Sequence, residues 1–530
     1  MTPDDAYRWL TEHSLETAYL KSMGRVLGWD QRTHIPAKGH DHRHNQFALL
    51  AKWIHVRATD PRMGEALARV EASDLVVDPM AVAAVNVREW RRDYDRAVKI
   101  PQALAVALAK ATAEGETVWE RSRPQDDWET FQPFLATVVA LKRQEAQALG
   151  YAAEPYDALL DDFEPGETAA ALAPLLGELR VSLLRVLAAV QESGRRPQGE
   201  VVRRHFPVDS QDRLVRLAAQ AIGYDFAGGR LDPTAHPFST DIGPGDVRIT
   251  TRFDEHYFCP AFFGVLHETG HALYDQGLPA AHWGTPLGDT VSLGIHESQS
   301  RLWENLVGRS LGFWHFFYKR AQEVFPVLHD VPLNTFHFAI NEVKPSLIRT
   351  EADEVTYNLH ILLRFELERA LMNGDLEVKD LPGAFNDKMR AYLGLTPPGP
   401  GQGVMQDIHW SAGLFGYFPT YTLGNLYAAQ FCASAEAQLG PLEEGFARGD
   451  FAPLLTWLKD KIHSQGNRLW ARPLVQEVTG EELTPRYLVR YLQRNFGALS
   501  DFPAEGFYYQ RRQPTSNTPN CRGGARTAPT

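Results

Sequence analysis

The stretch Phe258–Leu278, FCPAFFGVLHETGHALYDQGL, decides how this chain of 530 residues is organised. Its apolar residues recur at helical spacing and Pro260 suits a first turn, so the stretch predicts a buried helix. Positions four apart lie on one helix face, which lets His267 and His271 present imidazole nitrogens to a single metal ion. Glu268 flanks this pair, where its carboxylate can take a proton from water. We therefore predict a metal-binding helix that also carries a candidate general base.

Two histidines do not complete a catalytic metal site, which usually has three protein ligands and one open position. Residues 294–311, GIHESQSRLWENLVGRSL, predict a second amphipathic helix that carries Glu297 and His296 as rival third ligands. Spacing alone does not separate these two. Asp275 and Asp289 are candidate acceptors for the outer N–H groups of the imidazoles. Imidazole and carboxylate ligands favour zinc, although cobalt or manganese also suits them.

The composition excludes several classes of protein. A net charge of −12 argues against a general binder of nucleic acid or anionic membranes, which would need a basic face. The three cysteines, Cys259, Cys432 and Cys521, are too few and too scattered for a disulfide framework, which favours a reducing compartment. The N-terminus has no apolar signal core, and we find no apolar run of membrane length. We expect a soluble cytoplasmic protein.

Most of the chain has the apolar spacing of helices, and we expect a mainly α fold. Between Tyr224 and His256 two short alternating runs flank the turn sequence IGPGD, which predicts a hairpin. Such a hairpin could hold an extended substrate beside the metal helix, or it could be purely structural. We expect the helices to include residues 81–100, 101–121, 128–149, 167–191, 314–327, 334–349, 350–372, 421–439, 442–448, 451–465 and 484–496.

Six short segments occur in this order along the chain: HPF at 236–238, DVRIT at 246–250, HETGH at 267–271, HESQS at 296–300, IRTEAD at 348–353 and GVMQDIHW at 403–410. Together they resemble the thermostable carboxypeptidase, or carboxypeptidase Taq, family of metallocarboxypeptidases. The early WDQ triplet at residues 29–31 and the long helical N-terminal half are also similar to this family, so the resemblance covers about residues 1–500.

The resemblance implies a two-lobed, shell-shaped helical fold with a deep groove and the metal helix on its floor. We expect one domain over residues 1–500, with an N-terminal helical lobe of about 1–200 and a catalytic part of about 201–500. The extension 501–530 has no counterpart in the resemblance, and its composition predicts disorder from about residue 511. The resemblance also implies a homodimer.

Carried over by position, the resemblance makes His267, His271 and Glu297 the metal ligands and Glu268 the general base. It implies a carboxypeptidase that releases single amino acids from peptide C-termini with broad specificity. A tetrahedral oxyanion needs further hydrogen-bond donors in such a reaction. The candidates are His409 from the GVMQDIHW segment and a nearby phenol, for which we favour Tyr421 over Tyr417 by analogy with related shell-shaped zinc peptidases. His236 and Asp407 are expected to orient neighbouring groups.

A carboxypeptidase must also recognise a free carboxylate, and the planar fork of arginine can bind both oxygens. Arg248 in DVRIT and Arg349 in IRTEAD are the candidates. The alternative for each is an internal ion pair, for instance with Asp246 or Asp353.

Two other functions remain open at this point. A zinc oligoendopeptidase or dipeptidyl carboxypeptidase would use the same metal chemistry, but its substrate would not present a free carboxylate to Arg248 or Arg349. A helical scaffold with a structural metal, or none, is the second alternative. Glu268 argues against the scaffold, because a structural site is closed by four ligands and needs no neighbouring base.

Overall fold

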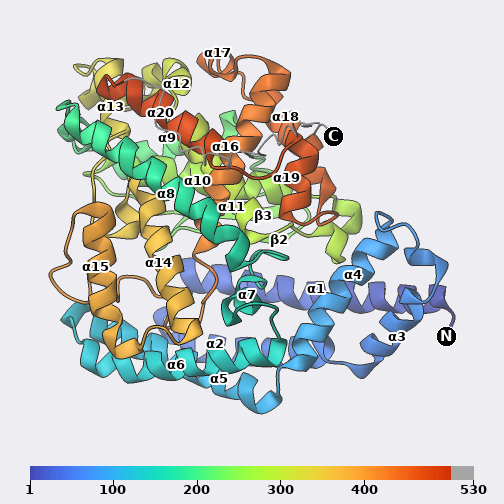
Figure 1. Ribbon diagram of the computed structural model, residues 1–530. Coiled ribbons are helices and arrows are strands. Elements are labelled where there is room, and N and C mark those ends of the chain that lie inside the picture. Colours follow the sequence, from blue (N-terminus) through green and yellow to red (C-terminus); the bar gives the residue numbers. More distant parts are fainter. Residues whose placement is uncertain (503–530) are drawn as a thin grey trace, which may run out of the picture.

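The computed structural model describes residues 1–502, and within that range the chain forms twenty α-helices and one three-stranded sheet (Figure 1). None of the helices in this range is long and apolar enough to span a membrane. The helices and strands are α1 (Pro3–Thr33), α2 (His40–Ala58), α3 (Pro61–Glu71), α4 (Val82–Lys99), α5 (Gln102–Ser122), α6 (Trp128–Leu149), α7 (Pro155–Leu160), α8 (Ala169–Glu192), α9 (Val208–Ala221), β1 (Leu231–Pro233), β2 (Ser239–Gly243), β3 (Asp246–Thr251), α10 (Phe258–Gly277), α11 (Leu293–Arg301), α12 (Leu311–Val324), α13 (Leu333–Ile340), α14 (Thr356–Asn373), α15 (Leu381–Leu393), α16 (Pro419–Leu439), α17 (Leu442–Ala447), α18 (Ala452–Lys461), α19 (Ala471–Thr479) and α20 (Arg486–Ser500).

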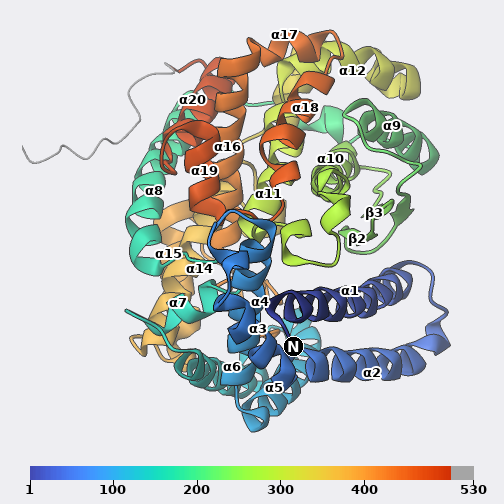
Figure 2. The ribbon, with the colours of Figure 1, turned by 90° about the vertical axis from the view of Figure 1, so that its right-hand side faces the viewer.

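The helices form two layers that face each other. Helices α1 to α6 lie along one side of the molecule, whereas α8 to α13 and α16 to α20 lie along the other (Figure 1). Seen from the side, α1 runs beneath the sheet and α10 (Figure 2). One apolar core extends from Ala111 on α5 to Phe496 on α20, and a smaller cluster joins α1, α3 and α4. The expected mainly α, two-lobed fold is confirmed, and the disorder expected from about residue 511 lies outside the described residues.

The small sheet directly precedes α10, the helix predicted to bind the metal. β2 and β3 pair antiparallel, with Thr240 opposite Arg248, so the expected hairpin is confirmed. Gly245 takes a positive φ of 84° at its turn, a conformation that suits glycine. β1 adds to the other edge of β3 in parallel, which the local pattern did not predict. The strand order is therefore β1-β3-β2, with β2 at an edge.

Two helix predictions were wrong in part. The helix expected over residues 334–349 ends at Ile340, where the side-chain amide of Asn341 donates to the carbonyls of His337 and Arg309, and Pro345 prevents a helix from continuing beyond it. The next expected helix starts at Thr356 rather than at residue 350, since Asp353 accepts hydrogen bonds from the first free N–H groups of α14. The intervening chain places Arg349 in a short 3₁₀ turn.

Helices α10 and α11 approach each other unusually closely at Gly270. A Cβ atom added at Gly270 would lie 2.4 Å from the carbonyl oxygen of Gln299 and 2.6 Å from the Cα of Ser300. These two residues lie two and three positions after Glu297 on α11, so the absence of a side chain at Gly270 sets how near the two candidate ligand helices can lie. By contrast, no described heavy atom lies within 4 Å of a Cβ added at Gly264 on the same helix.

We predict that Gly270→Ala destabilises the fold by about 1–3 kcal/mol, because the new methyl group meets backbone that cannot rotate away. It should also lower the metal content, since α11 must shift. The matched variant Gly264→Ala should stabilise α10 by up to about 1 kcal/mol. Denaturant unfolding and metal analysis of both proteins test this, and equal stabilities would contradict the close approach.

Candidate metal centre

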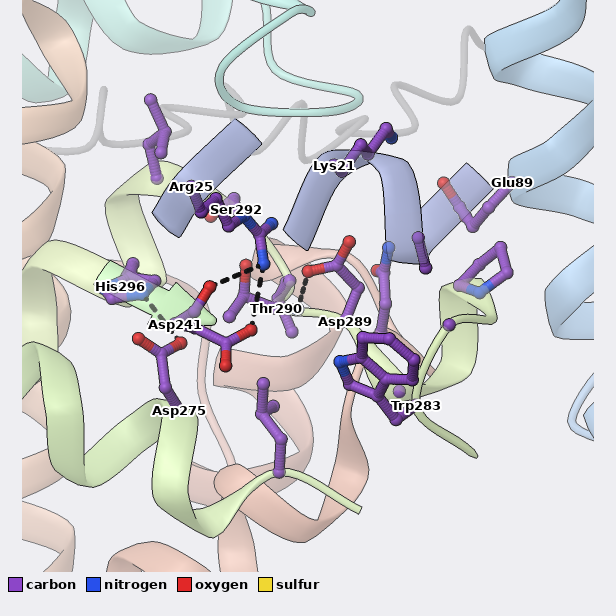
Figure 3. A pocket seen from close by; sticks show the side chains of 18 of the residues that line it. Lys21, Arg25, Glu89, Asp241, Asp275, Trp283, Asp289, Thr290, Ser292 and His296 are labelled. Carbon is purple, nitrogen blue, oxygen red and sulfur yellow. Dashed lines mark hydrogen bonds and ion pairs between the residues drawn. The ribbon is translucent and has the colours of Figure 1, made fainter. Parts of the chain in front are cut away.

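A cleft of about 940 Å³ opens between α1 on one side and the sheet, α10 and α11 on the other. The strand β2 contributes its free edge to the wall, and Tyr417 and Tyr421 contribute their rings. Figure 3 shows the part of the cleft where Arg25 of α1 faces Asp241 of β2 and Asp275 faces His296. The predicted metal helix and hairpin therefore line one common cavity.

His267, His271 and Glu297 come together on the floor of this cleft. Their candidate ligand atoms all lie within 4.8 Å of one another. Oε2 of Glu297 is 3.6 Å from Nε2 of His267 and 3.4 Å from Nε2 of His271. Two imidazoles and one carboxylate, open to a cleft on the remaining side, fit a catalytic divalent metal such as zinc.

Each histidine of this group is held by a second residue through its other ring nitrogen. Nδ1 of His267 donates to Glu304 over 2.8 Å. Nδ1 of His271 lies 2.6 Å from Nδ1 of His296, whose Nε2 is 3.1 Å from Asp275. Every group in this series of hydrogen bonds has a partner when His271 donates to His296 and His296 donates to Asp275. This arrangement leaves Nε2 of His271 free for a metal.

Sequence reasoning missed Glu304, and it placed His296 among the rival ligands. Glu297, Arg301 and Glu304 are spaced by four and three residues, which puts them on one helix face and could have revealed them. After Arg301 the expected α-helix becomes a π-helical turn, Leu302–Val307, that carries Glu304. Turns of this kind are frequent at functional sites. The other expected acceptor, Asp289, instead accepts from the N–H of Thr290.

Glu268 lines the cleft next to the ligand group and is only 7% exposed. Burial raises the pKa of its carboxyl group from 4.5 to about 7. A group with a pKa near neutrality can both accept and return a proton, which is the property that general acid–base chemistry needs.

Tyr421 and His409 form a hydrogen-bonded pair at the cleft wall. The Tyr421 hydroxyl lies 3.1 Å from Nε2 of His409, and the imidazole stacks on Phe418. Tyr421 and Tyr417 line the cleft, whereas His409 lies behind them. Burial lowers the pKa of His409 to about 4, so the imidazole is neutral near pH 7. The phenol is thus the member of the pair that faces the cavity.

Both candidate arginines are paired with carboxylates of the chain itself. Arg248 donates two bonds of 2.7 Å to Asp246 and stacks over Trp29. Arg349 is 5% exposed and donates to Asp407 rather than to Asp353. Neither is among the described residues that line the cleft.

Asp407 binds a second guanidinium, that of the buried Arg364, so two arginines share one carboxylate. Together these two cations hold the pKa of Asp407 far below its ordinary value despite burial. Asp407 thus orients Arg349. The exposed His236 precedes Pro237 and Phe238, which line the cleft.

The opposite wall contributes cations that the sequence did not single out. Lys21 and Arg25 of α1 line the cleft, and Arg25 donates to both the carbonyl and the carboxylate of Asp241 over 3.0 Å. Ser22 donates to the carbonyl of Ile242 over 2.6 Å. Side chains of α1 therefore occupy part of the free edge of β2.

The start of α11 is anchored by the loop between α7 and α8. Glu164 accepts hydrogen bonds from the N–H of Gly294 and from the hydroxyls of Ser292 and Tyr427. The carbonyl of Phe163 accepts from Leu293. These bonds satisfy the first N–H groups of the helix that carries Glu297.

Comparison with known proteins identifies relatives along almost the whole chain. A sequence model of the family described as carboxypeptidase Taq (M32) metallopeptidase matches residues 9–496. Thermostable carboxypeptidase 1 of Thermus thermophilus is 57% identical over 509 residues, which cover 94% of this chain and 100% of that protein. Carboxypeptidase 1 of Bacillus subtilis is 40% identical over 477 residues, covering 89% and 94%. The crystal structure of M32 carboxypeptidase from Deinococcus radiodurans R1 superposes with a TM-score of 0.91 at 39% identity, covering 94% of this chain and 100% of that one.

The buried Glu164 predicts a specific pH dependence of stability. Burial raises its pKa from 4.5 to about 7 in the folded protein, so the folded state holds this proton more tightly than the unfolded state does. Its contribution therefore makes the free energy of unfolding fall as the pH rises from about 4.5 to about 7. Glu164→Gln should remove this component, worth on the order of 3 kcal/mol.

Denaturant unfolding across this pH range measures the effect as the difference between wild type and variant. Glu444→Gln, at an exposed position on α17, is the control and should follow the wild type at every pH. If the free energies of unfolding of wild type and Glu164→Gln changed with pH in parallel, the carboxyl group of Glu164 would not be taking up the proton.

Proposed function

This chain belongs to the carboxypeptidase Taq (M32) family of metallopeptidases, and from that membership we propose how its cleft carries out the reaction. The protein is a metal-dependent carboxypeptidase. We propose that it releases single amino acids from the C-termini of peptides with broad specificity, with zinc as the metal and cobalt or manganese as possible substitutes. The observation that carries the proposal is the group His267, His271 and Glu297 with Glu268 beside it in an open cleft.

When bound by His267, His271 and Glu297, a divalent metal ion would make water more acidic and polarise the peptide carbonyl. Glu268 accepts the proton of the attacking water and later delivers a proton to the leaving amine. Its buried position in the cleft wall, next to the three ligands, supports both steps.

Tyr421 is proposed to donate a hydrogen bond to the oxyanion that forms when water attacks the carbonyl. Its place on the cleft wall supports this role, and its bond to His409 fixes the direction of the hydroxyl. His409 then acts by orienting Tyr421. Tyr417 lines the same wall and remains the alternative donor.

Arg349 and Arg248 are proposed to recognise the free carboxylate of the substrate. The guanidinium of Arg349 lies 5.0 Å from the ring centroid of Tyr421, which places it just behind the proposed oxyanion donor. Either arginine must exchange its present aspartate partner to bind a substrate carboxylate. Arg25 does line the cleft, so the experiment below compares its role in carboxylate recognition with those of Arg349 and Arg248.

From the resemblance to the family we propose that the protein is a homodimer and is located in the cytoplasm. Its proposed partners are peptides with a free C-terminus, and neither nucleic acid nor membranes are among them. Helices α1 and α2 expose the apolar side chains of Tyr19, Met23, Leu49, Trp53 and Val56, which offer a surface for a second subunit.

The main experiment is mass spectrometry of a mixed-sequence peptide and its C-terminally amidated twin after incubation with the zinc-loaded protein. We expect stepwise loss of single C-terminal residues from the free peptide only. Glu268→Gln should lower kcat by about 10²- to 10⁴-fold without loss of metal, because it removes the base and leaves the ligands intact.

Internal cuts or released dipeptides that persist after amidation would favour the oligoendopeptidase or dipeptidyl carboxypeptidase over the single-residue activity. A metal-loaded protein without cleavage would contradict the proposed function altogether. Unchanged kcat in Glu268→Gln would refute the role of Glu268 alone.

A second prediction concerns carboxylate recognition. Arg349→Lys and Arg248→Lys should reduce the preference for free over amidated peptides, measured as the ratio of kcat/KM values. A lost bidentate contact to a charged group corresponds to about a 10- to 100-fold change. If neither variant changes the ratio but Arg25→Lys does, recognition of the carboxylate lies with α1 instead.

A further inference from the structure

The guanidinium of Arg301 lies between the third ligand and the residue that orients the first ligand. Its Nε donates to Oε1 of Glu297 over 2.7 Å. Its Nη1 donates to Oε2 of Glu304 over 3.0 Å, and the same oxygen accepts from His267. The Arg301 guanidinium is therefore bonded to the ligand Glu297 on α11 and, through Glu304, is connected to the ligand His267 on α10.

The two carboxylate oxygens of Glu297 consequently have different partners. Oε2 faces both imidazoles, at 3.6 Å from His267 and 3.4 Å from His271, and the hydroxyl of Ser300 lies 2.9 Å from it. Oε1 accepts the Nε–H of Arg301. A metal ion that used both oxygens would have to share Oε1 with this charge-assisted hydrogen bond, which draws electron density away from Oε1 and makes it the poorer ligand atom.

The position of Arg301 is itself fixed. Its side chain is 13% exposed, and the guanidinium lies 4.4 Å from the ring centroid of Tyr357. The Tyr357 hydroxyl accepts a hydrogen bond of 2.9 Å from Arg349. Arg301 is bonded to the carboxylates of both Glu297 and Glu304. Moving its guanidinium away would leave both buried carboxylates without this partner, so the guanidinium is held in place.

We propose that Arg301 is a positioning residue that restricts Glu297 to metal binding through Oε2 alone, and that holds Glu304 so that His267 presents Nε2. A carboxylate that binds through one oxygen leaves open the coordination position that a catalytic site needs. This inference rests on the proposed function, because it takes His267, His271 and Glu297 as the ligands.

Cobalt is the probe, since four-coordinate Co²⁺ absorbs visible light more strongly than Co²⁺ of higher coordination number. In the wild-type protein loaded with Co²⁺ we expect the strong, low-coordinate spectrum. Arg301→Met frees Oε1, so we expect weaker absorption and a lower kcat with little change in KM. Metal affinity should fall about 10- to 100-fold, as is usual when an outer partner of a ligand is lost.

Arg301→Lys separates positioning from simple charge compensation. A single ammonium can reach Glu297 or Glu304 but cannot span both, so metal affinity should recover in part while kcat stays low. Arg472→Met is the matched control. Arg472 makes a comparable two-bond pair with the buried Glu167 outside the cleft lining, so this variant should lower thermal stability without altering the cobalt spectrum.

A crystal structure or X-ray absorption spectrum of the zinc-loaded wild-type protein decides the question even if Arg301→Met fails to fold. Binding of zinc by Glu297 through one oxygen supports the inference, and binding through both oxygens overturns it. An unchanged cobalt spectrum in Arg301→Met would overturn it as well. Stoichiometric metal in His267→Ala would instead refute the ligand assignment on which the proposed function rests.

Discussion

The close approach of α10 and α11 is the constraint on which the rest of the site depends. Gly270 offers no side chain at the crossing, and Gly424 on α16 leaves room for Glu297, since a Cβ there would lie 2.5 Å from its Cγ. Protein interiors do not compress to absorb an extra methyl group. The distance between the histidines on one helix and the carboxylate on the next is therefore set by backbone packing rather than by the ligands.

This packing buries a dense set of charges, and each must be compensated. Glu297, Arg301 and Glu304 alternate in charge along one helix face, while Asp275 accepts a hydrogen bond from His296. Removing one member of such a network leaves its partner buried and uncompensated, which is costly. The network thereby fixes the direction of the candidate ligand atoms, which is the arrangement that an efficient metal catalyst requires.

The opposite wall gives the cleft its depth. α1 reaches the sheet through Arg25 and Ser22, and Ser14 donates to the carbonyl of Gly284 over 2.7 Å. These are polar bonds at the edge of the cleft rather than part of the main apolar core, so α1 is held by fewer buried apolar contacts than α10. Segments with that kind of attachment open more readily than core helices, which is consistent with a wall that admits a peptide.

The sequence by itself determined the local features. The spacing of His267 and His271, the apolar pattern of α10 and the breaker-rich turn before β3 each depend on residues close in the chain, and helix and strand geometry follows from such spacing. Only the tertiary structure decided which distant residues meet: Arg349 pairs with Asp407, 58 residues away, and Glu304 reaches His267 through a π-helical turn. These pairings depend on how whole helices pack, and no local pattern encodes that packing.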